Sequence, residues 1–154
     1  MANPDDLAAL AAAFRKARYQ VPALGDTGSV RVGSTASALE TALPGRSFAF
    51  ITAWNGNSEA EERMDNAAAD GALAAELDRL QLARWRAVAD DAQGGHREAG
   101  WLVQDLALAD LDRLARRFDQ DGTLAWTRGD GVRLRMYHPC PTKALPDLWT
   151  DWVE

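Results

Sequence analysis

Apolar residues recur along this chain with helical spacing in some stretches and with strand-like spacing in others. The first stretch predicts an amphipathic helix over residues 3–19, in which Asn3 can cap the start and Pro4 suits the first helical position. Its apolar side chains fall on one helical face, which should pack on the body of the protein: Leu7, Leu10, Ala11 and Phe14. A short strand is weakly indicated at 29–33.

The clearest strand pattern covers residues 47–54, where nearly every side chain is apolar. Such a run predicts a central strand covered on both faces. Polar and glycine residues end it at 55–57, and a long helix is predicted over 58–82. Ser58 and Glu61 have the spacing of a capping box at the start of that helix.

The later pattern predicts strands at 84–89 and 100–104, a third helix at 109–118, and a closing hairpin of 123–127 with 132–137. Together these elements predict an α/β (α+β) fold in which a mixed β-sheet of about five to six strands is covered by three helices. No linker or repeat divides the sequence, so a single domain is expected over 1–154.

The tail, residues 138–154, combines prolines with large apolar side chains, among them Leu148, Trp149 and Trp152. Two hypotheses explain it. Packing across the chain's own surface is favoured, and docking onto a protein partner or a second copy, as a homodimer, is the alternative.

Composition narrows the compartment and the partners. With 154 residues, 47% hydrophobic and 26% charged, the chain has the composition of a globular protein. Cys140 is its one cysteine, which excludes an internal disulfide and favours a reducing compartment. We expect no membrane span and a cytoplasmic location. The net charge of −6 makes nucleic acid an unlikely partner.

Several short runs resemble an uncharacterised bacterial family, the domain of unknown function 3293. They lie within about residues 46–136 and comprise Ile51-Thr52-Ala53-Trp54-Asn55, Asn57-Ser58, Asn66, Glu98 before Trp101-Leu102-Val103, and Phe118-Asp119-Gln120. The chain departs from the family's pattern at Gly56, where the family has proline, and at Asp119, where it has glycine. The resemblance implies no known activity, and the departures imply that a site shared by the family is altered here.

The polar residues in these runs predict a binding site. Ligands of open α/β sheets sit beyond the carboxyl ends of strands, where the next helix begins. The predicted ligand-binding residues are Trp54, Asn55, Asn57, Ser58, Glu98, Trp101 and Gln120. Asn55, Glu98 and Gln120 at one sheet edge would suit a nucleoside, sugar or amide-like ligand. The competing interpretation, slightly favoured, is that each satisfies backbone groups at a strand end.

Charge and residue type restrict the chemistry further. Glutamates at 59, 61 and 62 oppose an anion beside Ser58, and capping explains that helix start better. Glu98 is a weak candidate for a catalytic acid or base. His96 and His138 lack partners at metal-ligand spacing, so we expect no metal and no cofactor.

Two arginine pairs, Arg84 with Arg86 and Arg133 with Arg135, are interpreted as solvated faces of edge strands. Two functional hypotheses follow from the whole sequence. One is a small-ligand protein, with catalysis left open. The other is a non-catalytic interaction protein, such as an acidic adaptor, inhibitor or immunity-type partner.

Overall fold

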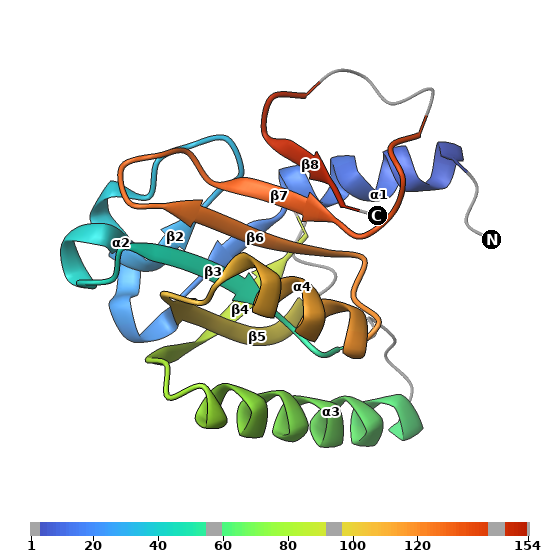
Figure 1. Cartoon of the computed structure of the whole chain (residues 1–154), viewed down its shortest axis with the longest axis horizontal. Helices are drawn as coiled ribbons and strands as arrows, with labels where there is room; N and C mark the ends of the chain where they lie inside the picture. Colours follow the sequence, from blue (N-terminus) through green and yellow to red (C-terminus); the bar gives the residue numbers. More distant parts are fainter. Residues whose placement is uncertain (1–3, 55–59, 92–96, 142–146, 154) are drawn as a thin grey trace.

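A computed structural model describes residues 4–54, 60–91, 97–141 and 147–153. Within these residues the strands form one eight-stranded sheet in the order β2-β1-β4-β5-β3-β6-β7-β8 (Figure 1). The strands are β1 (Arg18–Gln20), β2 (Ser29–Val30), β3 (Ser47–Ile51), β4 (Arg84–Asp90), β5 (Arg97–Gln104), β6 (Gly122–Thr127), β7 (Arg133–Met136) and β8 (Thr150–Trp152). The pairings between neighbours are antiparallel except β7 with β8, which is parallel, so the sheet is mixed as predicted.

The helical segments in the described part of the chain are α1 (Pro4–Lys16), the 3-10 helix η1 (Pro22–Gly28), α2 (Ser37–Ala42), α3 (Ala60–Arg79) and α4 (Leu108–Arg117). The three predicted helices are therefore confirmed, with α3 unbroken at Gly71. The predicted capping box at Ser58 and Glu61 lies outside the residues whose side chains are described.

The number of elements was underestimated. The sheet has eight strands rather than five to six, and α2 and η1 were not predicted. The missed strands β1 and β8 have three residues each, which is too short for alternation to be visible. They exist because longer neighbours, β4 and β7, offer them backbone hydrogen-bonding partners.

Strand β3 lies inside the sheet and separates two hydrophobic cores, as its apolar pattern predicted. Phe48 and Phe50 belong to one core with residues of α1, η1 and α2, whereas Ala49 and Ile51 belong to the other with residues of α3 and α4. Successive strand residues face opposite sides of a sheet, so position alone assigns each side chain to a core.

The tail returns to the body of the protein in its described part. Strand β8 pairs with β7, and Trp152 packs against the core on the α1 side. Trp149 lies so close to Gly131 that a Cβ atom there would come within 2.5 Å of its ring. Arg15 of α1 forms an ion pair with Asp147 at 2.7 Å. These contacts match the hypothesis of packing on the chain's own surface.

The interpretation of the arginine pairs as edge-strand faces was wrong. β4 lies between β1 and β5, and β7 lies between β6 and β8, so neither is an edge strand. Their arginines bind carboxylates: Arg135 binds Asp112 of α4 at 2.7 Å, and Arg86 binds Asp70 of α3 at 2.9 Å. Arg86 and Arg135 therefore attach helices to the sheet, whereas Arg133 binds Asp151 of the neighbouring strand β8.

No helix in the described ranges is long and apolar enough to cross a membrane.

Candidate functional site

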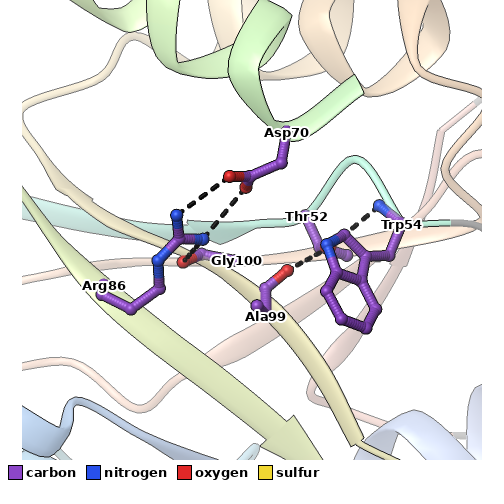
Figure 2. Close-up of polar contacts among 6 residues, drawn as sticks. All are labelled: Thr52, Trp54, Asp70, Arg86, Ala99 and Gly100. Carbon is purple, nitrogen blue, oxygen red and sulfur yellow. Dashed lines mark hydrogen bonds and ion pairs between the residues drawn. The ribbon is translucent and has the colours of Figure 1, made fainter. Parts of the chain in front are cut away.

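The segment that follows β3 is held by the hydroxyl of Thr52. This buried hydroxyl donates a hydrogen bond to the Ala99 carbonyl at 2.7 Å and accepts one from the Trp54 backbone N–H at 3.0 Å (Figure 2). The first bond keeps the segment against β5, and the second fixes the turn of the backbone. As a result the indole of Trp54 points away from α3, toward the side of the sheet that α1 covers (Figure 2).

Gln120 reaches the same place from the end of α4. Asp119 takes the left-handed conformation, with φ of 52°. Its backbone N–H donates to Arg116 O, and that of Gln120 donates to Ala115 O, which is the Schellman arrangement that ends many helices. The side-chain Nε2 of Gln120 then donates to the Trp54 carbonyl at 3.0 Å. Two segments 66 residues apart are thereby joined.

A pocket of about 330 Å³ opens between α1 and this end of the sheet. One stripe of α1 and the residue after it supply an apolar wall, made of Leu10, Ala13, Phe14 and Ala17. The sheet supplies aromatic rings from Tyr19, Phe50 and Trp54, together with the hydroxyl side chain of Thr52. The remaining lining includes Gln120 and five carboxylates: Asp90, Asp91, Glu98, Asp119 and Asp121.

The pocket unites some of the residues that the sequence proposed for a site. Trp54, Glu98 and Gln120 all line it. Asn55, Asn57 and Ser58, as well as Gly56 and His96, lie outside the described residues.

Trp101 does not join the pocket. It sits on the opposite face of β5, among the apolar residues under α3 and α4. There the guanidinium carbons of Arg86 and Arg84 lie 3.7 and 4.7 Å from the centre of its ring. The strand period explains this placement, because Glu98, Gly100 and Leu102 share one side of β5 and Trp101 takes the other.

Carboxylates are the charged side chains of the described pocket lining. No described residue of its lining is arginine, lysine or histidine. From outside the lining, the Arg97 guanidinium lies 3.9 Å from Asp90, and the His138 imidazole lies 2.7 Å from Asp121.

The hydrogen bonding and the pKa of the Tyr19 hydroxyl depend on this environment. Its hydroxyl donates to the Phe14 carbonyl at 2.8 Å, which joins β1 to α1. Burial raises the pKa of Tyr19 well above its usual value, and the charge of Glu98 raises that pKa further. The phenol therefore stays protonated and acts as a fixed donor.

The carboxylates do not form a metal cage. Among the described residues, no group of three or more histidine, cysteine, aspartate or glutamate side chains is arranged to hold a metal ion. Cys140 is exposed and does not belong to the pocket lining. The pocket combines an apolar wall with a few polar groups, as small-molecule sites do.

The sequence did not predict most of the residues that line this pocket. The stripe of α1 was identified as a packing face, yet Leu10 and Phe14 are only half-buried and line the pocket. Tyr19 lies on a strand too short to predict. Asp90 and Asp91 follow the predicted strand at 84–89 and were not among the predicted site residues. The pairing of β4 with β5 places Asp90 beside Arg97, near Glu98.

Comparison with protein families agrees with the resemblance seen in the sequence. Residues 51–122 match the model of a family described as Protein of unknown function (DUF3293). The chain carries a DUF3293 segment. This segment includes Thr52, Trp54, Glu98 and Gln120, whereas α1 and Tyr19 lie before it. No curated protein and no solved structure matches the chain.

The DUF3293 segment therefore supplies most of the polar side of the pocket, and the preceding residues supply most of its apolar wall. Asp119, which departs from the resembled pattern, stands at a left-handed position that favours glycine. Its carboxylate lines the pocket, so this departure adds a negative charge to it.

Proposed function

We propose that this protein binds a small organic molecule in the pocket between α1 and the ends of β3, β5 and β6. The observation that carries the proposal is the convergence of Trp54, Glu98 and Gln120, from three distant parts of the sequence, on one pocket of about 330 Å³. A volume of this size falls at the lower end of the range for small-molecule sites.

The lining favours a ligand with both a flat apolar part and hydrogen-bonding groups. Trp54 and Phe14 offer aromatic and apolar surface, while Thr52, Gln120 and the carboxylates offer polar contacts. Nucleosides, sugars and amide-like compounds combine these two features. Glu98 is the group proposed to exchange a proton if the bound molecule reacts.

Contacts at Gln120 argue that the site is organised before binding. Its Nε2 also donates to the Phe118 carbonyl at 3.1 Å, so both of its hydrogen bonds are made to backbone carbonyls. Thr52 likewise uses its hydroxyl on Ala99 and Trp54. Preformed walls reduce the ordering that a ligand must impose, and this favours binding.

A thermal-shift screen against nucleosides, nucleotides, sugars and amides tests the proposal, followed by titration calorimetry on each hit. Glu98→Gln should weaken binding about tenfold or more, because a hydrogen bond to a charged group contributes roughly 1.5–3 kcal/mol. Its melting temperature should stay close to that of the wild type.

The matched control is Asp26→Asn, which removes the same unit of charge from an exposed residue of η1 outside the pocket. It should bind like the wild type. A screen without any hit contradicts the proposal, and so does a Glu98→Gln protein that binds every hit normally. Loss of folding in Glu98→Gln would assign Glu98 a structural role instead.

A further inference from the structure

On the basis of the proposed function, we infer that the ligand of this pocket is a flat aromatic or heteroaromatic molecule whose polar edge carries several N–H or O–H donors. An amino- or hydroxy-substituted ring has this character. The hydrogen bonds that the pocket side chains already make point to such a ligand, because they use up the donors of the pocket and leave its acceptors.

Hydroxyl donors of the described lining are engaged within the chain. Four side chains of that lining carry an N–H or O–H donor: Tyr19, Thr52, Trp54 and Gln120. The Tyr19 hydroxyl donates to the Phe14 carbonyl at 2.8 Å. The Thr52 hydroxyl donates to the Ala99 carbonyl at 2.7 Å (Figure 2). Neither hydroxyl therefore has a hydrogen left to donate to a ligand.

Amide donors at the Gln120 end of the pocket are engaged as well. The two hydrogens of Gln120 Nε2 go to the carbonyls of Trp54 and Phe118, at 3.0 and 3.1 Å. The backbone N–H groups of Trp54, Asp119 and Gln120 also donate within the chain, at 3.0, 3.2 and 2.9 Å. The indole N–H of Trp54 makes no hydrogen bond within the described residues, so it is the one side-chain donor of that lining left for a ligand.

Acceptors remain available at the same end. Because two carbonyls hold Nε2 of Gln120, the amide is fixed and its Oε1 is the acceptor end, which makes no hydrogen bond within the described residues. The Asp119 carboxylate has no hydrogen bond or ion pair in that part of the chain either. Any ionised carboxylate of the lining can only accept, whatever it already contacts. The polar edge of the pocket is therefore made mainly of acceptors.

Such an edge discriminates between ligands by the direction of their hydrogen bonds. A ligand carbonyl or ether oxygen would lose its hydrogen bonds to water and meet acceptor oxygens instead. A ligand N–H or O–H exchanges its bond to water for one to Gln120 Oε1 or to a carboxylate. The apolar wall and the rings, among them Leu10, Phe14 and Trp54, favour a flat apolar body behind those donors.

Four neutral probes of nearly equal bicyclic shape test the inference by titration calorimetry at pH 7: 5-hydroxyindole, indole, benzofuran and 1-indanone. The first has two donors, the second has one and the last two have none, while 1-indanone adds a carbonyl acceptor. Because all four are uncharged, the series does not depend on the charge of the pocket. Each donor should tighten binding about twofold to tenfold, as one net hydrogen bond does. 1-Indanone should bind no more tightly than benzofuran.

Two variants assign the effect to the acceptors of the pocket. Asp119→Gly removes one acceptor at a left-handed position that glycine tolerates, and Gln120→Met removes the other while keeping the length of the side chain. At least one of them should weaken 5-hydroxyindole about threefold or more, with benzofuran changed less than twofold. Asp26→Asn, in an exposed residue of η1 outside the pocket, is the control and should leave every affinity unchanged. If neither variant separates the two probes, the inference fails.

The outcomes also separate this inference from the proposed function. If benzofuran or 1-indanone binds as tightly as 5-hydroxyindole, the donor inference fails and the proposed function stands. If none of the four binds but the wider screen gives a hit, the hit is compared with its N- and O-methylated derivative. A loss of about threefold or more on methylation supports the inference, whereas an unchanged affinity, or a hit without any donor, overturns it. If neither the screen nor the four probes bind, both fail.

Discussion

Acidic side chains gather on two regions of this protein, and the two regions treat them differently. Under α3 and α4 the carboxylates meet arginines from the sheet: Asp112 binds Arg135 through two hydrogen bonds of 3.0 and 2.7 Å, and Asp70 binds Arg86 in the same two-pronged way. The pocket beside α1 is lined by five carboxylates, and none of its described lining residues is basic.

Carboxylates have different roles on the two faces of the sheet. Where a carboxylate and an arginine meet, they anchor a helix to the sheet, and their removal should change stability. Beside the pocket, α1 is attached by apolar contacts, by the Tyr19 hydroxyl and by the ion pair of Arg15 with Asp147, so the pocket carboxylates are not needed to hold it. Their removal should change ligand binding instead.

The variant Asp112→Ala should give the largest loss of stability. Both partners are nearly buried, with side chains 14% and 15% exposed, and the Tyr137 hydroxyl also donates to Asp112 at 2.8 Å. Removing the carboxylate takes away the partner of the Arg135 guanidinium and of the Tyr137 hydroxyl. We expect this loss to lower the free energy of unfolding by about 2–3 kcal/mol. Urea denaturation measures the change. Asp110→Asn, on the exposed side of the same helix, should change it by less than about 0.5 kcal/mol; equal losses would contradict the assignment.

Trp101→Leu should give the next largest effect. The variant keeps the side chain apolar but removes the ring on which Arg84 and Arg86 stack. We expect a loss of about 1–2 kcal/mol. Because Trp101 lies on the α3 face, ligand binding in the pocket should be unchanged. Trp54→Leu is the opposite case and should weaken binding more than stability. Reduced binding in Trp101→Leu would show that the two faces are coupled.

The stability that Asp112 contributes should depend on pH. Burial raises the pKa of Asp112, but hydrogen bonds from Arg135 and Tyr137 outweigh burial and hold that pKa below its usual value. A depressed folded pKa contributes stability that is present above the unfolded value, near 3.9, and is lost as the pH falls through the folded value. The stability gap between wild type and Asp112→Ala should therefore narrow below about pH 4. A gap that stays constant from pH 5 to pH 2 would refute this.

Substitution of Asp119 should give the smallest change in the free energy of unfolding, and this change should be a gain in stability. Glycine adopts φ of 52° without the steric strain of a side chain, so Asp119→Gly should raise the free energy of unfolding by about 0.5–1 kcal/mol. Asp119→Asn removes the charge but keeps a residue that tolerates this conformation, and should be nearly neutral. A destabilised Asp119→Gly would mean that the carboxylate holds the turn.

The sequence by itself determined the elements whose patterns are long enough to read. Runs of apolar residues located β3, α3 and α4 within a few residues, and the alternation of elements predicted a mixed sheet covered by helices. It also selected Trp54, Glu98 and Gln120, which lie at strand or helix ends within the runs that carry the family resemblance. Short strands such as β1 and β8 were not predicted, because three residues are too few to show an alternating pattern.

The tertiary structure alone decided which residues meet. Glu98 and Trp101 are three positions apart on β5, and the odd spacing sends them to opposite faces, a choice that depends on which face each helix covers. The long-range pairing of β1 with β4 brought Tyr19 to Ala89, and with it the α1 wall. Whether an acid anchors a helix or lines a pocket depends on the neighbours that folding supplies. The sequence therefore named residues for a site, and only the sheet's pairing made a pocket from some of them.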